Sequence, residues 1–328
     1  KTADLIRIFG ILGEEKNAGR IARMIEKRRL SQRFEMTKDL ADAIQTLVGR
    51  RQGVRVIAVS RFGYLRTPRP ADASPQAQAD AHVCLLDALG ITQAAVVGVS
   101  ADGPSAMQSA LRHPDRVSAL VLVVPIAYKP GTVPDSAPPV SDNKDALLLR
   151  LLGSDFLFWA GLHVARDSLM RHVLATPPEL VAAASEQERG RINDLADRLL
   201  PVSLRAAGLR DDTRLGKRLG ADALESIRVP TLVASARDDG FGTFASSQYV
   251  ASRIPGAKFV GFERGGHLLV GHNEAVQAEI VKLIGAAPGC AHCATAASTS
   301  LRFLRLALCW ACCERCSCCH ASAPWAPC

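Results

Sequence analysis

The feature that most constrains the fold of this chain is an alternation of short, β-branched apolar runs with amphipathic helical stretches. Apolar runs occupy residues 54–60, 94–100, 117–125, 229–236 and 257–263, and helical stretches occupy residues 75–90, 104–114, 244–253 and 273–284. A short apolar run bounded by turn residues is typical of a strand that is buried on both faces. The order strand, helix, strand predicts a parallel sheet with right-handed crossovers, so we expect an α/β fold.

Charge and cysteine usage divide the 328 residues into three segments. We expect residues 1–53 to form a basic helical segment and residues 288–328 to form an irregular, Cys-rich tail, with the α/β part between them. Within that part the alternation stops at residues 128–226, which begin with a Pro-rich loop and continue as helical pieces. We interpret this stretch as a helical cap inserted into a core that consists of residues 54–127 and 227–287.

The most informative local motif is GVSADG, residues 98–103, which joins a buried strand to a helix. A serine between small residues at such a turn presents its hydroxyl above the carboxyl edge of the sheet. The N–H groups at the start of the following helix favour a developing oxyanion there. We therefore predict Ser100 as a nucleophile, with a serine that serves only the turn as the alternative.

A serine hydroxyl becomes a good nucleophile when a base takes its proton. His267, in RGGHLLVGH, follows the last apolar run on a Gly-rich loop, so we predict it as the base. The rivals are His272, near the start of the last helix, and His113, just before a proline.

A carboxylate should orient the imidazole of that base. The segment ARDDG follows the apolar run 229–236 at another strand end. We predict Asp239 as this acid and keep Asp238 as its rival, since either carboxylate could instead cap the turn or the next helix. Along the chain the order is serine, aspartate, histidine.

These linked motifs resemble the α/β-hydrolase family, from about Val54 to Gly285, with the stretch 128–226 as the family's cap. The resemblance is carried by VRVIAVSRFGYLRTP, AAVVGVSADGPSAMQSALRHPDRVSALVLVVP, VPTLVASARDDGFGT and ERGGHLLVGHNEAV. It implies a triad of Ser100, Asp239 and His267 and an oxyanion hole that uses the backbone N–H of Ala101. It also implies hydrolysis of a small ester, amide or similar bond in a small-molecule substrate, and we expect neither a cofactor nor a metal.

Two departures from the family pattern bear on activity. The family usually has a small residue two places after the nucleophile, whereas this chain has Asp102, which places negative charge near a developing oxyanion. The family's first strands and its oxyanion loop should precede residue 54, and residues 1–53 do not resemble them. We expect a sheet without those strands and the loss of one oxyanion donor, which lowers a rate by roughly 10²–10³-fold. A catalytically inactive hydrolase-like protein is therefore an alternative hypothesis.

Four large apolar side chains lie close together in the predicted cap: Phe156, Phe158, Trp159 and Leu162. We predict that Phe156 and Trp159 are substrate contacts in a pocket under the cap. Ordinary packing inside the cap is the alternative.

The first segment carries twelve Lys or Arg against seven Asp or Glu. It resembles a stretch of the small-subunit ribosomal RNA cytosine methyltransferases that lies outside their S-adenosylmethionine-binding motifs. An rRNA methyltransferase fragment without its catalytic part is thus a further hypothesis, although we expect a solvated helical appendage that makes no RNA contact. Three segments of unrelated character predict a chimeric or truncated chain.

Nine of the ten cysteines lie in the tail. Cys290-x₂-Cys293 and Cys309-x₂-Cys312 have the spacing of a four-thiolate zinc ribbon, but five further cysteines surround the second pair, so we predict no metal site. A single cysteine in the preceding residues is typical of a reducing compartment, which favours the cytoplasm. We expect no membrane span and no secretory signal, since the chain has no run of eighteen apolar residues and its start lacks the signal pattern.

Overall fold

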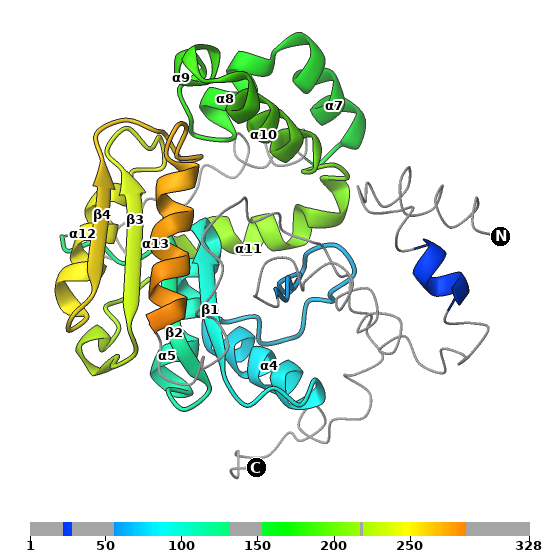
Figure 1. Ribbon diagram of the computed structural model, residues 1–328. Coiled ribbons are helices and arrows are strands. Elements are labelled where there is room, and N and C mark those ends of the chain that lie inside the picture. Colours follow the sequence, from blue (N-terminus) through cyan, green and yellow to red (C-terminus); the bar gives the residue numbers. More distant parts are fainter. Residues whose placement is uncertain (1–21, 28–55, 132–152, 217–218, 287–328) are drawn as a thin grey trace. The chain divides into compact units, whose positions relative to one another are not determined.

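The computed structural model describes residues 22–27, 56–131, 153–216 and 219–286. The chain divides into two compact units. The larger unit consists of Ser60–Cys290 with Cys309–Cys328 and holds every described strand, and the second unit consists of Lys1–Val59 with Ala291–Leu308. In the second of these units, residues 22–27 form the helix drawn in blue in Figure 1, in agreement with the helical period of the sequence.

A four-stranded parallel sheet forms the centre of the larger unit (Figure 1). In spatial order its strands are β1 (Ala94–Val99), β2 (Val117–Val123), β3 (Thr231–Ala236) and β4 (Lys258–Phe262). The register aligns Val97 with Val121, and Val233 with both Leu122 and Phe259. All six residues of β3 are buried, which explains why its sequence is a continuous small and apolar run.

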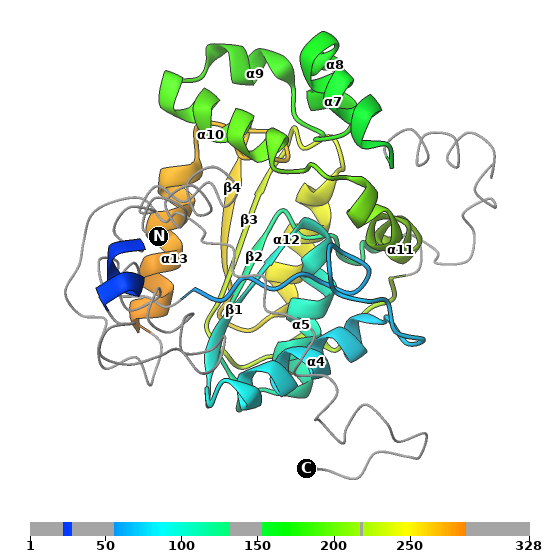
Figure 2. The same ribbon diagram turned by 90° about the vertical axis from the view of Figure 1, so that its right-hand side faces the viewer.

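Helices cover both faces of this sheet, as the edge-on view in Figure 2 shows. On one face lie α5 (Gly103–Arg112) and α12 (Thr243–Arg253), and α4 (Pro75–Ala88) packs against α5. On the other face lies α13 (Asn273–Ala286). Two hydrophobic clusters result, the first including Met107, Leu122, Val233 and Val250 and the second including Val124, Ala234, Leu269 and Val276. Burial of a Leu or Val side chain in such a cluster stabilises the folded state by about 1.5–3 kcal/mol relative to an exposed side chain.

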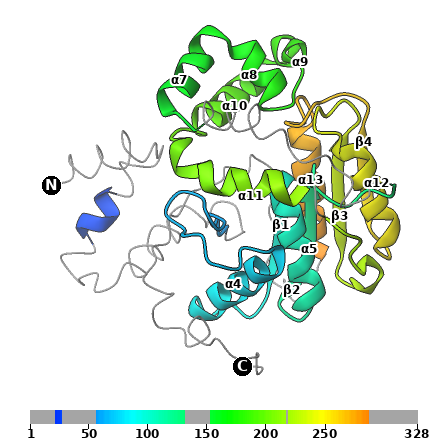
Figure 3. The same cartoon turned by 180° about the vertical axis from the view of Figure 1, so that it is seen from behind.

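A helical segment connects β2 to β3. In its described residues the α-helices are α7 (Asp155–Val164), α8 (Arg166–His172), α9 (Pro178–Ala183), α10 (Glu186–Asp197) and α11 (Ala206–Gly216). Helices α7 to α10 lie beyond the carboxyl ends of the strands (Figures 1 and 3) and share a core of their own that includes Phe158, Met170, Ile192 and Val202. Serine side chains cap the N-termini of two of these helices. Ser154 Oγ accepts a hydrogen bond from Leu157 N in α7, and Ser185 Oγ accepts one from Glu188 N in α10.

The prediction of a strand at residues 54–60 is wrong where the structure tests it. Residues 56–60 have no regular secondary structure, and residues 54 and 55 lie outside the described ranges. A β-branched run becomes a strand only when a neighbour pairs with its backbone groups, and no described strand pairs with this one. The predicted helix near residues 37–49 and the tail at residues 288–328 also lie outside the described ranges.

The other predicted strands and helices of the α/β part are present, with bounds that differ by at most two residues. Within the part of the chain that the structure describes, none of the helices is both long and apolar enough to cross a bilayer.

Candidate active site

Ser100 lies at a sharp turn between β1 and α5. It follows the last residue of β1 directly, opens the 3₁₀-helix η2 (Ser100–Asp102) and has a φ of 54°. A positive φ is uncommon for a residue with a side chain and marks a backbone that its surroundings hold in place. One such contact is the hydrogen bond of 2.9 Å from Ile126 N to Ser100 O. The turn therefore presents the hydroxyl at the carboxyl end of the sheet, as the GVSADG motif predicts.

Two glycines on either side of Ser100 allow α5 to approach β1 and the segment after β2 closely. A Cβ on Gly98 would lie 2.6 Å from Ala106 Cβ and 3.0 Å from Asp102 O. A Cβ on Gly103 would lie 2.7 Å from Pro125 Cβ. Neither position has room for a side chain, so Gly98 keeps α5 close to β1 and Gly103 keeps α5 close to the segment that follows β2.

The structure brings the three predicted residues Ser100, His267 and Asp239 into one hydrogen-bonded series. His267 Nε2 lies 2.9 Å from Ser100 Oγ, and His267 Nδ1 lies 2.9 Å from Asp239 Oδ2. When Nδ1–H donates to the carboxylate, Nε2 is left to accept the serine proton. The series joins three strand ends, because Ser100 follows β1, Asp239 follows β3 and His267 follows β4.

Asp239 is 5% exposed and is held by donors besides the imidazole. Its Oδ1 accepts from Phe241 N at 2.8 Å, and its Oδ2 accepts from the hydroxyl of Thr243 at the start of α12. Hydrogen bonds of this kind satisfy the acceptor oxygens of a buried carboxylate and hold it in place. The aromatic ring of Phe241 stands edge-on to the imidazole of His267, with ring centroids 4.7 Å apart.

The three rival residues have other partners. Asp238 Oδ1 accepts from Gly266 N at 2.7 Å and thus binds the loop that carries the histidine. His272 Nε2 lies 2.8 Å from Arg264 O. His113 pairs with a carboxylate of α4, on the outer side of α5. None of the three contacts Ser100 in a described hydrogen bond.

The connection between α8 and α9 holds the acid loop and the base loop together. The carbonyl oxygen of Ala175 accepts from Gly240 N at 3.0 Å and from His267 N at 3.2 Å. The hydroxyl of Thr176 accepts from Leu268 N at 3.1 Å. Sequence reasoning missed both residues, because a backbone carbonyl and a lone threonine inside a helical segment give no local signal.

Helix α10 also binds the loop of His267. Arg191 donates to Leu268 O at 2.9 Å, and Glu188 accepts from Gly271 N at 3.0 Å. The two side chains are joined by an ion pair at 2.7 Å. The helical segment is therefore part of the scaffold that positions the imidazole.

A cavity of about 320 Å³ opens beside Ala101, the predicted oxyanion donor. Its apolar wall includes Phe62, Pro75 and Leu215, and its polar wall includes Arg61, Arg69, Asp211 and Asp212. The cavity lies between the loop that precedes α4, the turn after Ser100, and α11.

The four large apolar residues that the sequence analysis names in α7 divide into two pairs. Phe158 and Leu162 are buried in the core of the helical segment. Phe156 and Trp159 are 70% and 48% exposed, their rings stack with centroids 6.1 Å apart, and neither lines the cavity beside Ala101. Their role as substrate contacts stays a prediction.

Among the described residues, no three His, Cys, Asp or Glu side chains are placed to hold a metal ion. The cysteine pairs of the tail lie outside the described ranges.

Comparison with known proteins confirms the resemblance of one segment to an rRNA methyltransferase. Over 61 residues, 19% of this chain, the sequence is 61% identical to the ribosomal RNA small subunit methyltransferase H of Brucella anthropi, and the match covers 18% of that protein. The Brucella ovis protein matches to the same extent. The matched part thus spans less than a fifth of the length of these curated relatives.

A larger match concerns the part that carries the site. The model of the alpha/beta hydrolase fold family matches residues 31–273. Among solved structures, an alpha/beta hydrolase fold protein from Nakamurella multipartita is 26% identical, with 69% of this chain and 80% of that chain covered and a TM-score of 0.49. An esterase from Exiguobacterium antarcticum is 18% identical, with 70% and 81% covered and a TM-score of 0.49. The family model matches more than half of the residues of this chain, so the chain belongs to the α/β-hydrolase fold family.

Proposed function

We propose that the chain is a serine hydrolase that cleaves a small ester, amide or similar bond with Ser100, His267 and Asp239. The observation that carries the proposal is the series of two 2.9 Å hydrogen bonds that runs from Asp239 through His267 to Ser100. A nucleophile in contact with a base, and that base in contact with a buried carboxylate, is the arrangement that acyl transfer requires.

In the first half of the reaction Ser100 Oγ forms a bond to the carbonyl carbon of the substrate while its proton passes to His267 Nε2. The carbonyl electron pair moves to the oxygen, which accepts a hydrogen bond from Ala101 N–H. Asp239 stabilises the imidazolium. The imidazolium then donates its proton to the leaving alcohol or amine as the bond to the carbonyl carbon breaks, which leaves an acyl-enzyme.

In the second half a water molecule attacks the acyl carbon, and His267 takes its proton. Collapse of the second oxyanion releases the acid and returns the proton to Ser100 Oγ. The same imidazole thus serves as base and as acid in each half, which requires the tautomer that Asp239 favours.

We place the substrate in the cavity beside Ala101 and propose that the helical segment 128–226 acts as its cap. A cavity of about 320 Å³ with an apolar wall fits a small acyl or alkyl group. The earlier prediction for Phe156 and Trp159 is tested by Trp159→Ala, which raises KM if the indole contacts substrate and leaves KM unchanged if it does not.

The proposal is tested with a fluorophosphonate probe, which forms a covalent bond with an activated serine. We expect the wild-type chain to be labelled and Ser100→Ala to lose the label. The matched control is Ser252→Ala, which removes an exposed hydroxyl on α12 and should leave labelling unchanged. Labelling that persists in Ser100→Ala would contradict the assignment, and a folded wild-type chain without any label would favour the inactive hydrolase-like protein.

An S-adenosylmethionine-dependent function has less support, since the similarity to the methyltransferase covers 18% of that relative. Calorimetry with S-adenosylmethionine tests it, and we expect no binding. We also propose a cytoplasmic location, because residues 1–289 contain a single cysteine, and cell fractionation tests that proposal.

A further inference from the structure

The α/β-hydrolase motif of this chain carries a carboxylate where a small residue is usual. Asp102 stands two places after Ser100 and ends the 3₁₀-helix η2. The predicted oxyanion donor Ala101 lies between them in the chain. A negative charge at this place opposes the negative charge that develops on the carbonyl oxygen.

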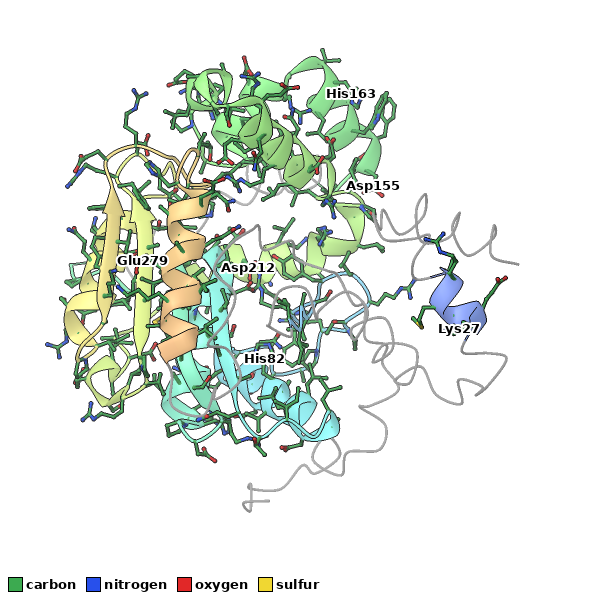
Figure 4. The ribbon with its side chains drawn as sticks, viewed as in Figure 1. Lys27, His82, Asp155, His163, Asp212 and Glu279 are labelled. Atoms are coloured by element: carbon green, nitrogen blue, oxygen red, sulfur yellow. The ribbon has the colours of Figure 1, made fainter. Side chains whose placement is uncertain are left out.

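Arg61 is the described residue that forms an ion pair with Asp102, through its Nε atom. Its two terminal nitrogens donate to Asp212 Oδ1 and Oδ2 of α11 at 2.7 and 2.6 Å. One guanidinium thus joins three segments: the loop before α4, the turn after Ser100, and α11, on which Figure 4 labels Asp212.

We propose that Arg61 is a positioning residue for Ser100, because it neutralises Asp102 beside the oxyanion site and ties the turn after Ser100 to α11. The inference rests on the proposed serine hydrolase function. It extends that function to a residue more than thirty positions from the nearest member of the triad.

Burial and further contacts hold the guanidinium in one position. The side chain of Arg61 is 19% exposed, and its guanidinium lies 4.7 Å from the centre of the Tyr64 ring. The hydroxyl of Tyr64 donates to the same Asp212 carboxylate. A planar guanidinium with two carboxylate partners and an aromatic neighbour has little freedom to rotate.

Burial raises the pKa of Asp102, and the charge of Arg61 acts against that shift, so Arg61 favours the charged carboxylate that it neutralises. Burial would lower the pKa of Arg61, but the hydrogen bond to Asp212 and the charges of Asp102 and Asp212 raise it above its ordinary value. Arg61 therefore stays charged at every pH at which a hydrolase of this kind operates. Removal of its side chain would leave Asp102 and Asp212 without their shared partner. Of these two carboxylates, Asp212 lines the cavity beside Ala101.

The experiment is a double-mutant cycle on the rate of fluorophosphonate labelling, measured on the full chain. Arg61→Met is expected to lower the rate by roughly ten- to a hundredfold, because the uncompensated charge of Asp102 opposes the oxyanion. Asp102→Asn in the same background removes that charge and is expected to recover most of the loss. Arg112→Met, which breaks a bidentate ion pair with Asp80 on the outside of α5, is the matched control and should leave the rate unchanged.

Asp102→Asn alone supplies a measurement that does not require Arg61→Met to fold. It is expected to be labelled at least as fast as the wild type, because Asp212 still holds the guanidinium. A tenfold or greater decrease in that variant would overturn the charge argument. The charge argument is also overturned if folded Arg61→Met is labelled at the wild-type rate. It is overturned as well if Arg61→Met is labelled slowly and the added Asp102→Asn does not recover the rate. If the proposed serine hydrolase function is itself wrong, the result is different, because the folded wild-type chain is then not labelled at all.

Discussion

Gly98→Ala tests the claim that the contact between β1 and α5 positions Ser100. The added methyl would lie 2.6 Å from Ala106 Cβ and 3.0 Å from Asp102 O. Carbon atoms pack at about 3.5–4.0 Å, so the strand and the helix would have to separate by roughly 1 Å. Neither neighbour can rotate away, because one is a Cβ and the other is a backbone oxygen.

A displacement of roughly 1 Å at a reacting group lowers a rate by about 10²-fold. Overpacking of this kind also destabilises a fold by about 1–3 kcal/mol. We therefore expect Gly98→Ala to be labelled by a fluorophosphonate about a hundredfold more slowly and to have a lower free energy of unfolding in urea.

The control is Gly190→Ala in the exposed middle of α10, where an added Cβ would meet nothing within 4 Å. There alanine replaces a poor helix former, so we expect a gain of about 0.5–1 kcal/mol and an unchanged labelling rate. Wild-type labelling and wild-type stability in Gly98→Ala would refute the reasoning.

Three further perturbations have defined outcomes. Asp239→Asn should leave the fold intact and slow labelling by roughly 10⁴-fold, because it favours the wrong tautomer of the base; a rate within tenfold of the wild type would contradict this. Burial lowers the pKa of His82 from 6.5 to about 4, so the unfolded chain binds a proton that the folded chain does not. The contribution of His82 to the free energy of unfolding should therefore be fully present above pH 6.5, and up to about 3 kcal/mol of it should be lost as the pH falls from 6.5 to 4. An equal loss in His82→Gln would show that another group is the cause. Ile227→Ala, at a fully buried position, should lower the free energy of unfolding in urea by about 2–5 kcal/mol, and a loss under 1 kcal/mol would show that the core refills the space.

The sequence predicts the sheet well because each central strand is buried on both faces. A strand such as β3, with six buried residues, must be apolar or small throughout, so its composition reveals its environment. The run at residues 54–60 has the same composition but no described partner, and pairing is a property of two segments rather than one.

The same distinction applies to the candidate site. Ser100, Asp239 and His267 stand at strand ends, where a parallel sheet brings distant residues to one edge, so sequence order and turn residues are enough to predict them. Arg61 and Asp212 lie 151 positions apart and meet through the packing of a loop against a helix. No short pattern in either segment indicates that contact.

The shared acceptor at Ala175 has a mechanical consequence. Because its carbonyl binds Gly240 N and His267 N together, a shift of the connection between α8 and α9 displaces the carboxylate and the imidazole in the same direction. Their mutual spacing is then conserved, whereas Ser100 stays behind on β1 and α5. We therefore expect a shift of this connection to change chiefly one distance, that between His267 Nε2 and Ser100 Oγ.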